Sequence, residues 1–239
     1  MPVVLRDLAE LPVGAHALGL YSERNEAVDQ AVQFLASAPP EMAVSFWVPH
    51  PEMAKRYNDR LAAAAPDRVG CVAVLDHEQV APVEGKLRPT PEITEFLSGH
   101  PEGVTAGGDT ISLYWDSDSM PEHLEYEAWF DEQPRTESRF LCPYDLRTVP
   151  SDDATNVLRV LGRLHSHVVL SSSSEPAVRL LQLFIFGSEA ELPGRLHGDL
   201  RWAAEHGYLE TRGSSGALEL TPTGRDVVRE WGDRTVVDW

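Results

Sequence analysis

Residues 139–145, RFLCPYD, decide the fold prediction. A short apolar run that ends in Cys142, Tyr144 and Asp145 is typical of a buried strand emerging at its carboxyl end. Open α/β sheets bind their ligands at the carboxyl ends of the strands. We therefore predict that these three side chains lie together in a ligand site.

The preceding segment, residues 121–132, is a predicted helix. It opens with proline at a first helical position, and Leu124 and Ala128 follow at helical spacing. Glu125 and Glu127 flank Tyr126 on this helix, which leads into the strand at 139–145. The helix therefore adds polar and aromatic candidates to the same site.

The rest of residues 1–174 alternates between strand and helix patterns. Apolar runs at 16–21, 42–48 and 69–75 are predicted strands, and helices are predicted between them. This order predicts an α/β fold with a mostly parallel sheet flanked by helices. Further strands are expected at 110–115 and 167–171, helices at 90–97 and 152–164, and an irregular loop at 76–88.

The pair formed by Leu124-Glu125-Tyr126-Glu127 and Cys142-Pro143-Tyr144-Asp145 resembles the MEDS sensory domain family of methanogens and methylotrophs. The resemblance spans about residues 15–171. It implies a RecA-like core without a working nucleotide loop, which senses small organic molecules or relays signals. It also implies that His16, Tyr126, Cys142 and Tyr144 line the sensor pocket. The complete predicted pocket is His16, Tyr21, Glu125, Tyr126, Cys142, Tyr144 and Asp145.

Residues 175–239 have a different pattern and are predicted to form a second domain. Helices are expected over 176–186 and 194–206, then a hairpin at 208–212 and 217–220, then a helix over 222–230. This order resembles an archaeal winged-helix domain, with the hairpin as the wing. Candidate DNA contacts are Arg195, His197, Arg201 and Arg212.

The charge of this second domain favours protein contact as an alternative to DNA binding. Residues 176–239 contain seven arginines and ten acidic residues. The helix that normally precedes a recognition helix is confined to residues 188–193. A winged helix can also serve as a dimerisation or protein-contact unit, since a fold does not determine a function.

The whole chain is strongly acidic. It has 38 acidic and 20 basic residues, a formal net charge of -18, and lysine only at positions 55 and 86. Such a surface repels nucleic acid at low salt. We interpret it as an adaptation to a salt-rich, haloarchaeal cytoplasm, where screening weakens the self-repulsion; an acidic mesophile protein is the alternative.

Enzyme, cofactor and metal motifs are not recognised. The turn after the first strand, Ser22-Glu23-Arg24-Asn25, has no glycine-rich phosphate loop. His165 ends a predicted helix and His167 begins a strand, so we do not expect the two to converge on a metal ion. We therefore predict no catalytic residues, no cofactor and no metal. An enzyme that uses Cys142 as nucleophile would need a base such as His16 within hydrogen-bond reach.

Localisation and partners follow from the same features. No apolar run reaches membrane-spanning length, no secretory signal is recognised, and the two cysteines are expected as reduced thiols. We predict a cytoplasmic, homodimeric regulator, with promoter DNA and a small organic ligand or signalling protein as partners. The alternative is a signalling adaptor that does not bind DNA.

Overall fold

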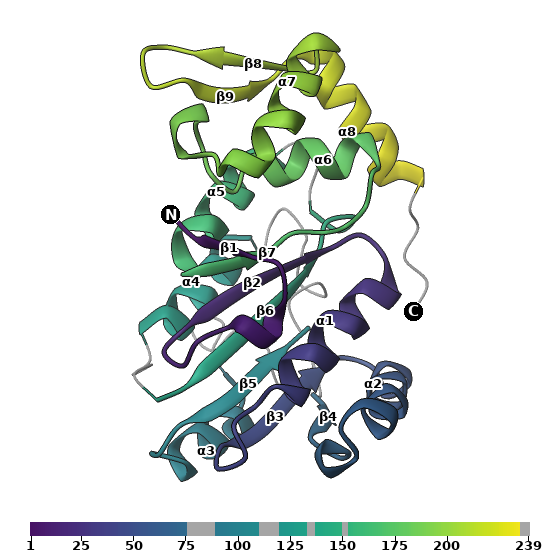
Figure 1. Cartoon of the computed structure of the whole chain (residues 1–239), viewed down its shortest axis with the longest axis vertical. Helices are drawn as coiled ribbons and strands as arrows, with labels where there is room; N and C mark the ends of the chain where they lie inside the picture. The colour runs from purple at the N-terminus through teal and green to yellow at the C-terminus, as the bar shows by residue number, and fades with distance from the viewer. Residues whose placement is uncertain (76–88, 110–119, 133–136, 150–152, 235–239) are drawn as a thin grey trace.

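A single parallel sheet organises most of the chain (Figure 1). The computed structural model describes residues 1–75, 89–109, 120–132, 137–149 and 153–234. Within those ranges, seven strands lie in the order β1-β7-β2-β6-β5-β3-β4, and all neighbouring pairs are parallel. The strands are β1 (Val3–Leu5), β2 (His16–Tyr21), β3 (Ala43–Val48), β4 (Val72–Val74), β5 (Val104–Gly108), β6 (Arg139–Asp145) and β7 (His167–Val169). The predicted α/β architecture is confirmed.

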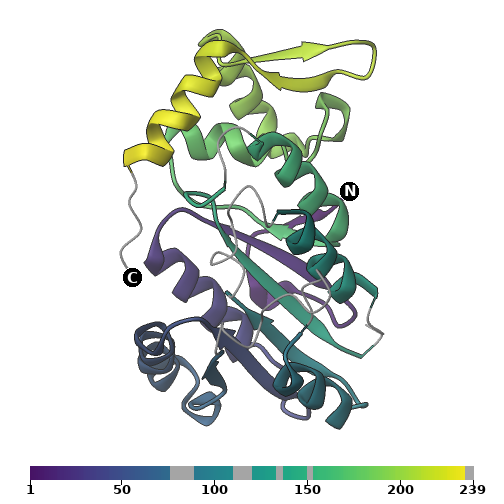
Figure 2. The same ribbon diagram turned by 180° about the vertical axis from the view of Figure 1, so that it is seen from behind.

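Helices cover both faces of the sheet (Figures 1 and 2). Side chains of α1 and α2 pack with Ala17 and Leu141 on one face, whereas those of α3, α4 and α5 pack with Leu18 and Cys142 on the other. Successive residues of a strand point to opposite faces, which explains this division. The helices are α1 (Arg24–Ala36), α2 (Pro51–Ala64), α3 (Pro91–Gly99), α4 (Met120–Glu132) and α5 (Ala154–Leu164). None of the helices in the described ranges is both long and apolar enough to cross a lipid bilayer.

The central strand β6 continues past Pro143 to Asp145, although proline usually interrupts a central strand. Cys142 lies in mid-strand, opposite Leu18 of β2, so its predicted place at the carboxyl end is wrong. Pro143 has no backbone N–H, but the ladder with β5 already ends at Leu141. The hydrogen bonds from the backbone amides of Phe140 and Leu146 run to the β2 side, so the Pro143 nitrogen faces the other side, beyond that ladder.

Two strands were not predicted, and two predictions cannot be compared. β1 lies before residue 16, where no strand is predicted, and β5 contains Gly107 and Gly108, which are typical of a turn. The predicted strand at 110–115 and the predicted loop at 76–88 lie outside the described residues.

The last quarter of the chain forms helices around an antiparallel hairpin. The hairpin pairs Leu209 with Leu220 and Arg212 with Ala217. The helix predicted over 194–206 is divided into a short 3-10 helix, Gly194–Leu196, and α7. The regular elements are α6 (Pro176–Leu183), α7 (His197–Glu205), β8 (Leu209–Arg212), β9 (Ala217–Leu220) and α8 (Pro222–Arg234).

Helix α5 joins this C-terminal unit to the sheet. One apolar cluster continues from the sheet through α5 into α6, α7, the hairpin and α8. Gly162 of α5 lies so close to the chain after α6 that an added Cβ would be 2.1 Å from the Ile185 carbonyl oxygen. Arg159 of α5 donates a hydrogen bond to the Leu218 carbonyl of β9 and lies over the Phe184 ring. The C-terminal unit is thus packed directly on α5.

Candidate functional site

The predicted sensor pocket is divided between two faces of the sheet. His16 begins β2 and Tyr21 ends it, and because five positions separate them they point to opposite faces. His16 lies on the face of α4 and α5 together with Cys142. Tyr21 and Asp145 are paired at the carboxyl ends of β2 and β6, on the opposite face from His16. The single predicted pocket is therefore wrong.

A buried cluster of four polar side chains occupies the first of these faces. It consists of His16, Glu127, Cys142 and His165, which come from β2, α4, β6 and the end of α5. The His16 Nε2 atom is 3.1 Å from Cys142 Sγ and 3.8 Å from Glu127 Oε2. The His165 Nε2 atom is 3.4 Å from the same Glu127 Oε2. If one ligand atom is taken from each residue, the four atoms all lie within 4.8 Å of one another.

Tyrosines predicted for the pocket surround this cluster. Tyr144 is buried, and burial, followed by the charges of Glu127 and Cys142, raises the pKa of Tyr144 well above its usual value. Tyr126 is buried and packs against Phe130, with ring centroids 5.1 Å apart. Glu125 is exposed on α4, so the carboxylate inside the protein is Glu127.

The cluster has one feature that a nucleophilic cysteine requires, a nearby histidine. It lacks the arrangement of a catalytic triad, in which a carboxylate orients that histidine. His16 is within hydrogen-bond reach of Cys142, as a general base would be. In a catalytic triad, the carboxylate orients the histidine through its second nitrogen. Here Glu127 approaches the same Nε2 atom that meets Cys142. The donor atoms therefore converge on one point, an arrangement that suits a bound cation.

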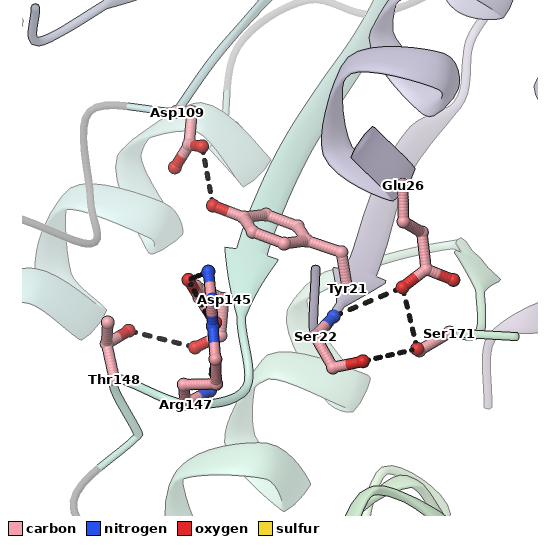
Figure 3. Close-up of polar contacts among 8 residues, drawn as sticks. All are labelled: Tyr21, Ser22, Glu26, Asp109, Asp145, Arg147, Thr148 and Ser171. Carbon is pink, nitrogen blue, oxygen red and sulfur yellow. Dashed lines mark hydrogen bonds and ion pairs between the residues drawn. The ribbon is translucent and has the colours of Figure 1, made fainter. Parts of the chain in front are cut away.

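A second polar group lies at the carboxyl ends of β2, β5 and β6 (Figure 3). The Tyr21 hydroxyl donates to Asp109 Oδ2 at 2.6 Å, and burial followed by the charges of Asp109 and Asp145 raises the pKa of Tyr21. Arg147 donates from Nε to both carboxylate oxygens of Asp145, at 2.8 and 3.1 Å. Burial by itself would lower the pKa of Arg147. The hydrogen bond to Asp145 and the charge of Asp145 have a larger opposite effect, so the pKa of Arg147 is raised. These groups satisfy one another inside the protein.

Glu26, in the first helical turn of α1, places its carboxylate beside the loop after β2, where a phosphate loop would lie (Figure 3). Its carboxylate accepts hydrogen bonds from the Ser22 amide at 3.1 Å, the Ser171 hydroxyl at 2.7 Å and the Ser172 amide at 2.5 Å. A helix N-terminus attracts anions because its amides are free to donate. Glu26 already fills this position with a negative charge, so a phosphate would meet like charge there.

A cleft separates the edge of the sheet from the C-terminal unit, and Arg195 lines it. Arg195 donates to the Leu5 carbonyl of β1 at 3.4 Å, and burial followed by the charge of Arg6 lowers the pKa of Arg195. It belongs to the 3-10 helix before α7 and faces β1. Arg195 therefore precedes α7 in the chain and contacts β1.

The other predicted DNA contacts belong to α7 and the hairpin. His197 and Arg201 are exposed on α7. On the hairpin, Arg212 forms ion pairs with Glu210 at 2.6 Å and Glu219 at 3.1 Å.

Two members of the buried cluster were absent from the predicted pocket. Glu127 stands beside Tyr126 in the sequence, but strand and helix patterns do not tell which of two neighbouring glutamates turns inward. His165 is not predicted to bind a ligand, and His167, the other histidine of that segment, begins β7 and is not part of the cluster. The signal available in the sequence was a histidine immediately after a strongly amphipathic helix, next to a buried strand.

Comparison with known proteins leaves the family open. No protein family model matches the chain, and no curated protein matches it. Among solved structures, the chain is similar to a structural-study target from Pyrococcus horikoshii OT3, at 13% identity and a TM-score of 0.47. That likeness covers 68% of this chain and 83% of the other.

Proposed function

We propose that this chain is a signal-sensing regulator. In this proposal the α/β unit, residues 1–174, receives the signal and the C-terminal unit, residues 175–239, delivers the output. The signal is a small molecule or a partner protein. The proposal includes the MEDS-like, RecA-like character of the first unit and the winged-helix character of the second, which rests on the order helix, helix, hairpin, helix.

The observation that carries the proposal is the position of α5. One end of this helix holds His165 in the buried cluster, and its body packs on the C-terminal unit through Gly162 and Arg159. A displacement of α5 by an event at the cluster would therefore move the surface on which the C-terminal unit rests. Two-state coupling between distant sites requires such a shared element.

A transcriptional output is the first candidate. His197 and Arg201 are exposed on α7, the helix that would enter the major groove in a winged helix. Promoter DNA would then be the partner, and a homodimer would read two half-sites. The net charge of -18 supports a saline cytoplasm, in which the repulsion between the protein and DNA is screened.

A protein-contact output is the second candidate, and the hairpin favours it. Glu210 and Glu219 hold Arg212, so the hairpin surface has more acidic than basic groups. Arg195 is turned toward the Leu5 carbonyl. An adaptor that contacts another protein through this acidic hairpin would have no use for a basic surface.

Chromatin immunoprecipitation in the native host, with Arg201→Glu compared to wild type, tests the transcriptional output. If α7 reads DNA, the reversed charge lowers the affinity at least about tenfold, and discrete promoter peaks are lost. Arg229→Glu is the matched control because Arg229 is an exposed arginine on α8, paired with Asp226. Its peaks are expected to remain.

Two outcomes would contradict the transcriptional output. One is a full set of wild-type peaks in Arg201→Glu. The other is an absence of peaks in well-expressed wild-type protein, which would leave the protein-contact output, to be tested by capture of a partner with the full chain and a hairpin variant, Glu219→Arg.

A further inference from the structure

We propose that His16, Glu127, Cys142 and His165 form the binding site of one divalent transition-metal ion of the zinc class. The site does not depend on the proposed regulatory function. It is inferred from the donor atoms, their positions, their surroundings and their charge.

The donor atoms select the class of metal. The cluster offers two imidazole nitrogens, one cysteine sulfur and one carboxylate oxygen. Zinc is bound by these ligand types, and a thiolate disfavours Mg²⁺ and Ca²⁺, which prefer oxygen. The residues come from four separate segments of the chain, so the site cannot be recognised from a short sequence motif.

The distances fit one tetrahedral ion. Bonds of about 2.0–2.3 Å place neighbouring ligands of such an ion roughly 3.3–3.8 Å apart. Three separations lie close to this range: 3.1 Å between His16 and Cys142, 3.8 Å between His16 and Glu127, and 3.4 Å between Glu127 and His165. All four donor atoms lie within 4.8 Å of one another. Small side-chain adjustments would bring all four donors to bonding distance.

The orientation of His165 is that of a metal ligand. Its Nδ1 atom is 2.8 Å from the Leu161 carbonyl oxygen, which only accepts, so Nδ1 carries the hydrogen. The Nε2 lone pair of the neutral ring then faces Glu127 Oε2, which is also an acceptor. A proton between His165 Nε2 and Glu127 Oε2 would satisfy only these two atoms, whereas a metal cation would bind all four residues. A hydrogen bond from the other ring nitrogen to a backbone carbonyl is the usual support of a metal-bound histidine.

The charges also balance. All four side chains are buried, and an uncompensated charge in such a place is costly. A thiolate at Cys142 and a carboxylate at Glu127 carry two negative charges, which one divalent ion neutralises. Four protein ligands also complete a tetrahedral shell, as in structural zinc sites, and leave no position for a reactive water. Bound metal would therefore fasten α4 and α5 to β2 and β6.

Cobalt titration of the purified full chain under reducing conditions tests the site. Co²⁺ substitutes for zinc and reports its ligands by a thiolate-to-cobalt charge-transfer band and by intense tetrahedral ligand-field bands. We expect both bands to saturate at one ion per chain, and zinc to abolish them. Metal analysis of the protein as isolated is expected to give the same stoichiometry.

Variants assign the ligands, and Cys71 provides the matched control. Cys142→Ser is expected to lose the charge-transfer band, whereas Cys71→Ser keeps it, because Cys71 is outside the cluster. Glu127→Gln and His165→Gln are expected to weaken cobalt binding, because each replaces one of the proposed ligands. Circular dichroism identifies any variant that does not fold.

The proposal is overturned if folded wild-type protein binds neither cobalt nor zinc. This result does not depend on whether the variants fold. The proposal is equally overturned if the charge-transfer band persists in Cys142→Ser. A hydrogen-bonded network without metal would give the first result. Neither readout involves DNA or a partner, so a failure of the regulatory proposal would leave this result unchanged.

Discussion

Arg147→Met is expected to lower the free energy of unfolding by about 3–5 kcal/mol, because it leaves a buried carboxylate without its cation. Asp145 is fully buried, and the Arg147 side chain is only 12% exposed. Asp109 lies nearby on the same side of the sheet, and its charge acts on Tyr21 together with that of Asp145. Without the guanidinium, two acidic groups would share a dry environment. Urea unfolding monitored by circular dichroism measures the loss.

A double-mutant cycle separates the charge from the packing. Asp145→Asn removes the negative charge, so the additional cost of Arg147→Met in that background is expected to fall to about 1–2 kcal/mol. Arg229→Met is the matched control, since its exposed ion pair with Asp226 is worth less than about 1 kcal/mol. A loss in Arg147→Met as small as that of the control would mean that solvent reaches Asp145.

The sheet was largely predictable because its strands have local signatures. The strand at 16–21 is a continuous apolar run, and it lies in the middle of the sheet with partners on both sides. The strand at 104–108 lacks such a signature because Gly107 and Gly108 resemble a turn. Glycine is needed at position 107 because of a tertiary contact: a Cβ on Gly107 would be 2.4 Å from the Leu141 carbonyl oxygen of β6. Local propensity cannot report such a contact.

The candidate site was predicted in part, and the period of a strand explains one error. His16 and Cys142 were both chosen, and they do meet. Tyr21 was placed with them, although five positions along a strand turn a side chain to the opposite face. That error was avoidable from the sequence. The convergence of His165 on His16 was not, because it depends on how α5 docks beside β2, at a separation of 149 residues that no local pattern records.

Gly162→Ala is expected to destabilise the protein by about 1–3 kcal/mol, through a contact that joins α5 to the C-terminal unit. An alanine normally stabilises a helix relative to glycine by up to about 1 kcal/mol. Here the added Cβ would lie 2.1 Å from the Ile185 carbonyl oxygen, and backbone atoms must separate to admit it. Since Ile185 lies two residues after the end of α6, the separation is expected to loosen residues 175–239 first. Limited proteolysis followed by mass spectrometry detects that order.

Gly198→Ala is the matched control because it makes the same change in a helix where no atom lies within 4 Å of the added Cβ. It is expected to be neutral or slightly stabilising, so the two alanines should change stability in opposite directions. Under the regulatory proposal, Gly162→Ala also weakens the output without altering metal binding, since the cluster residues are untouched. If Gly162→Ala unfolds like Gly198→Ala and proteolysis begins elsewhere, α5 does not hold the C-terminal unit in place, and the route from the buried cluster to the output fails.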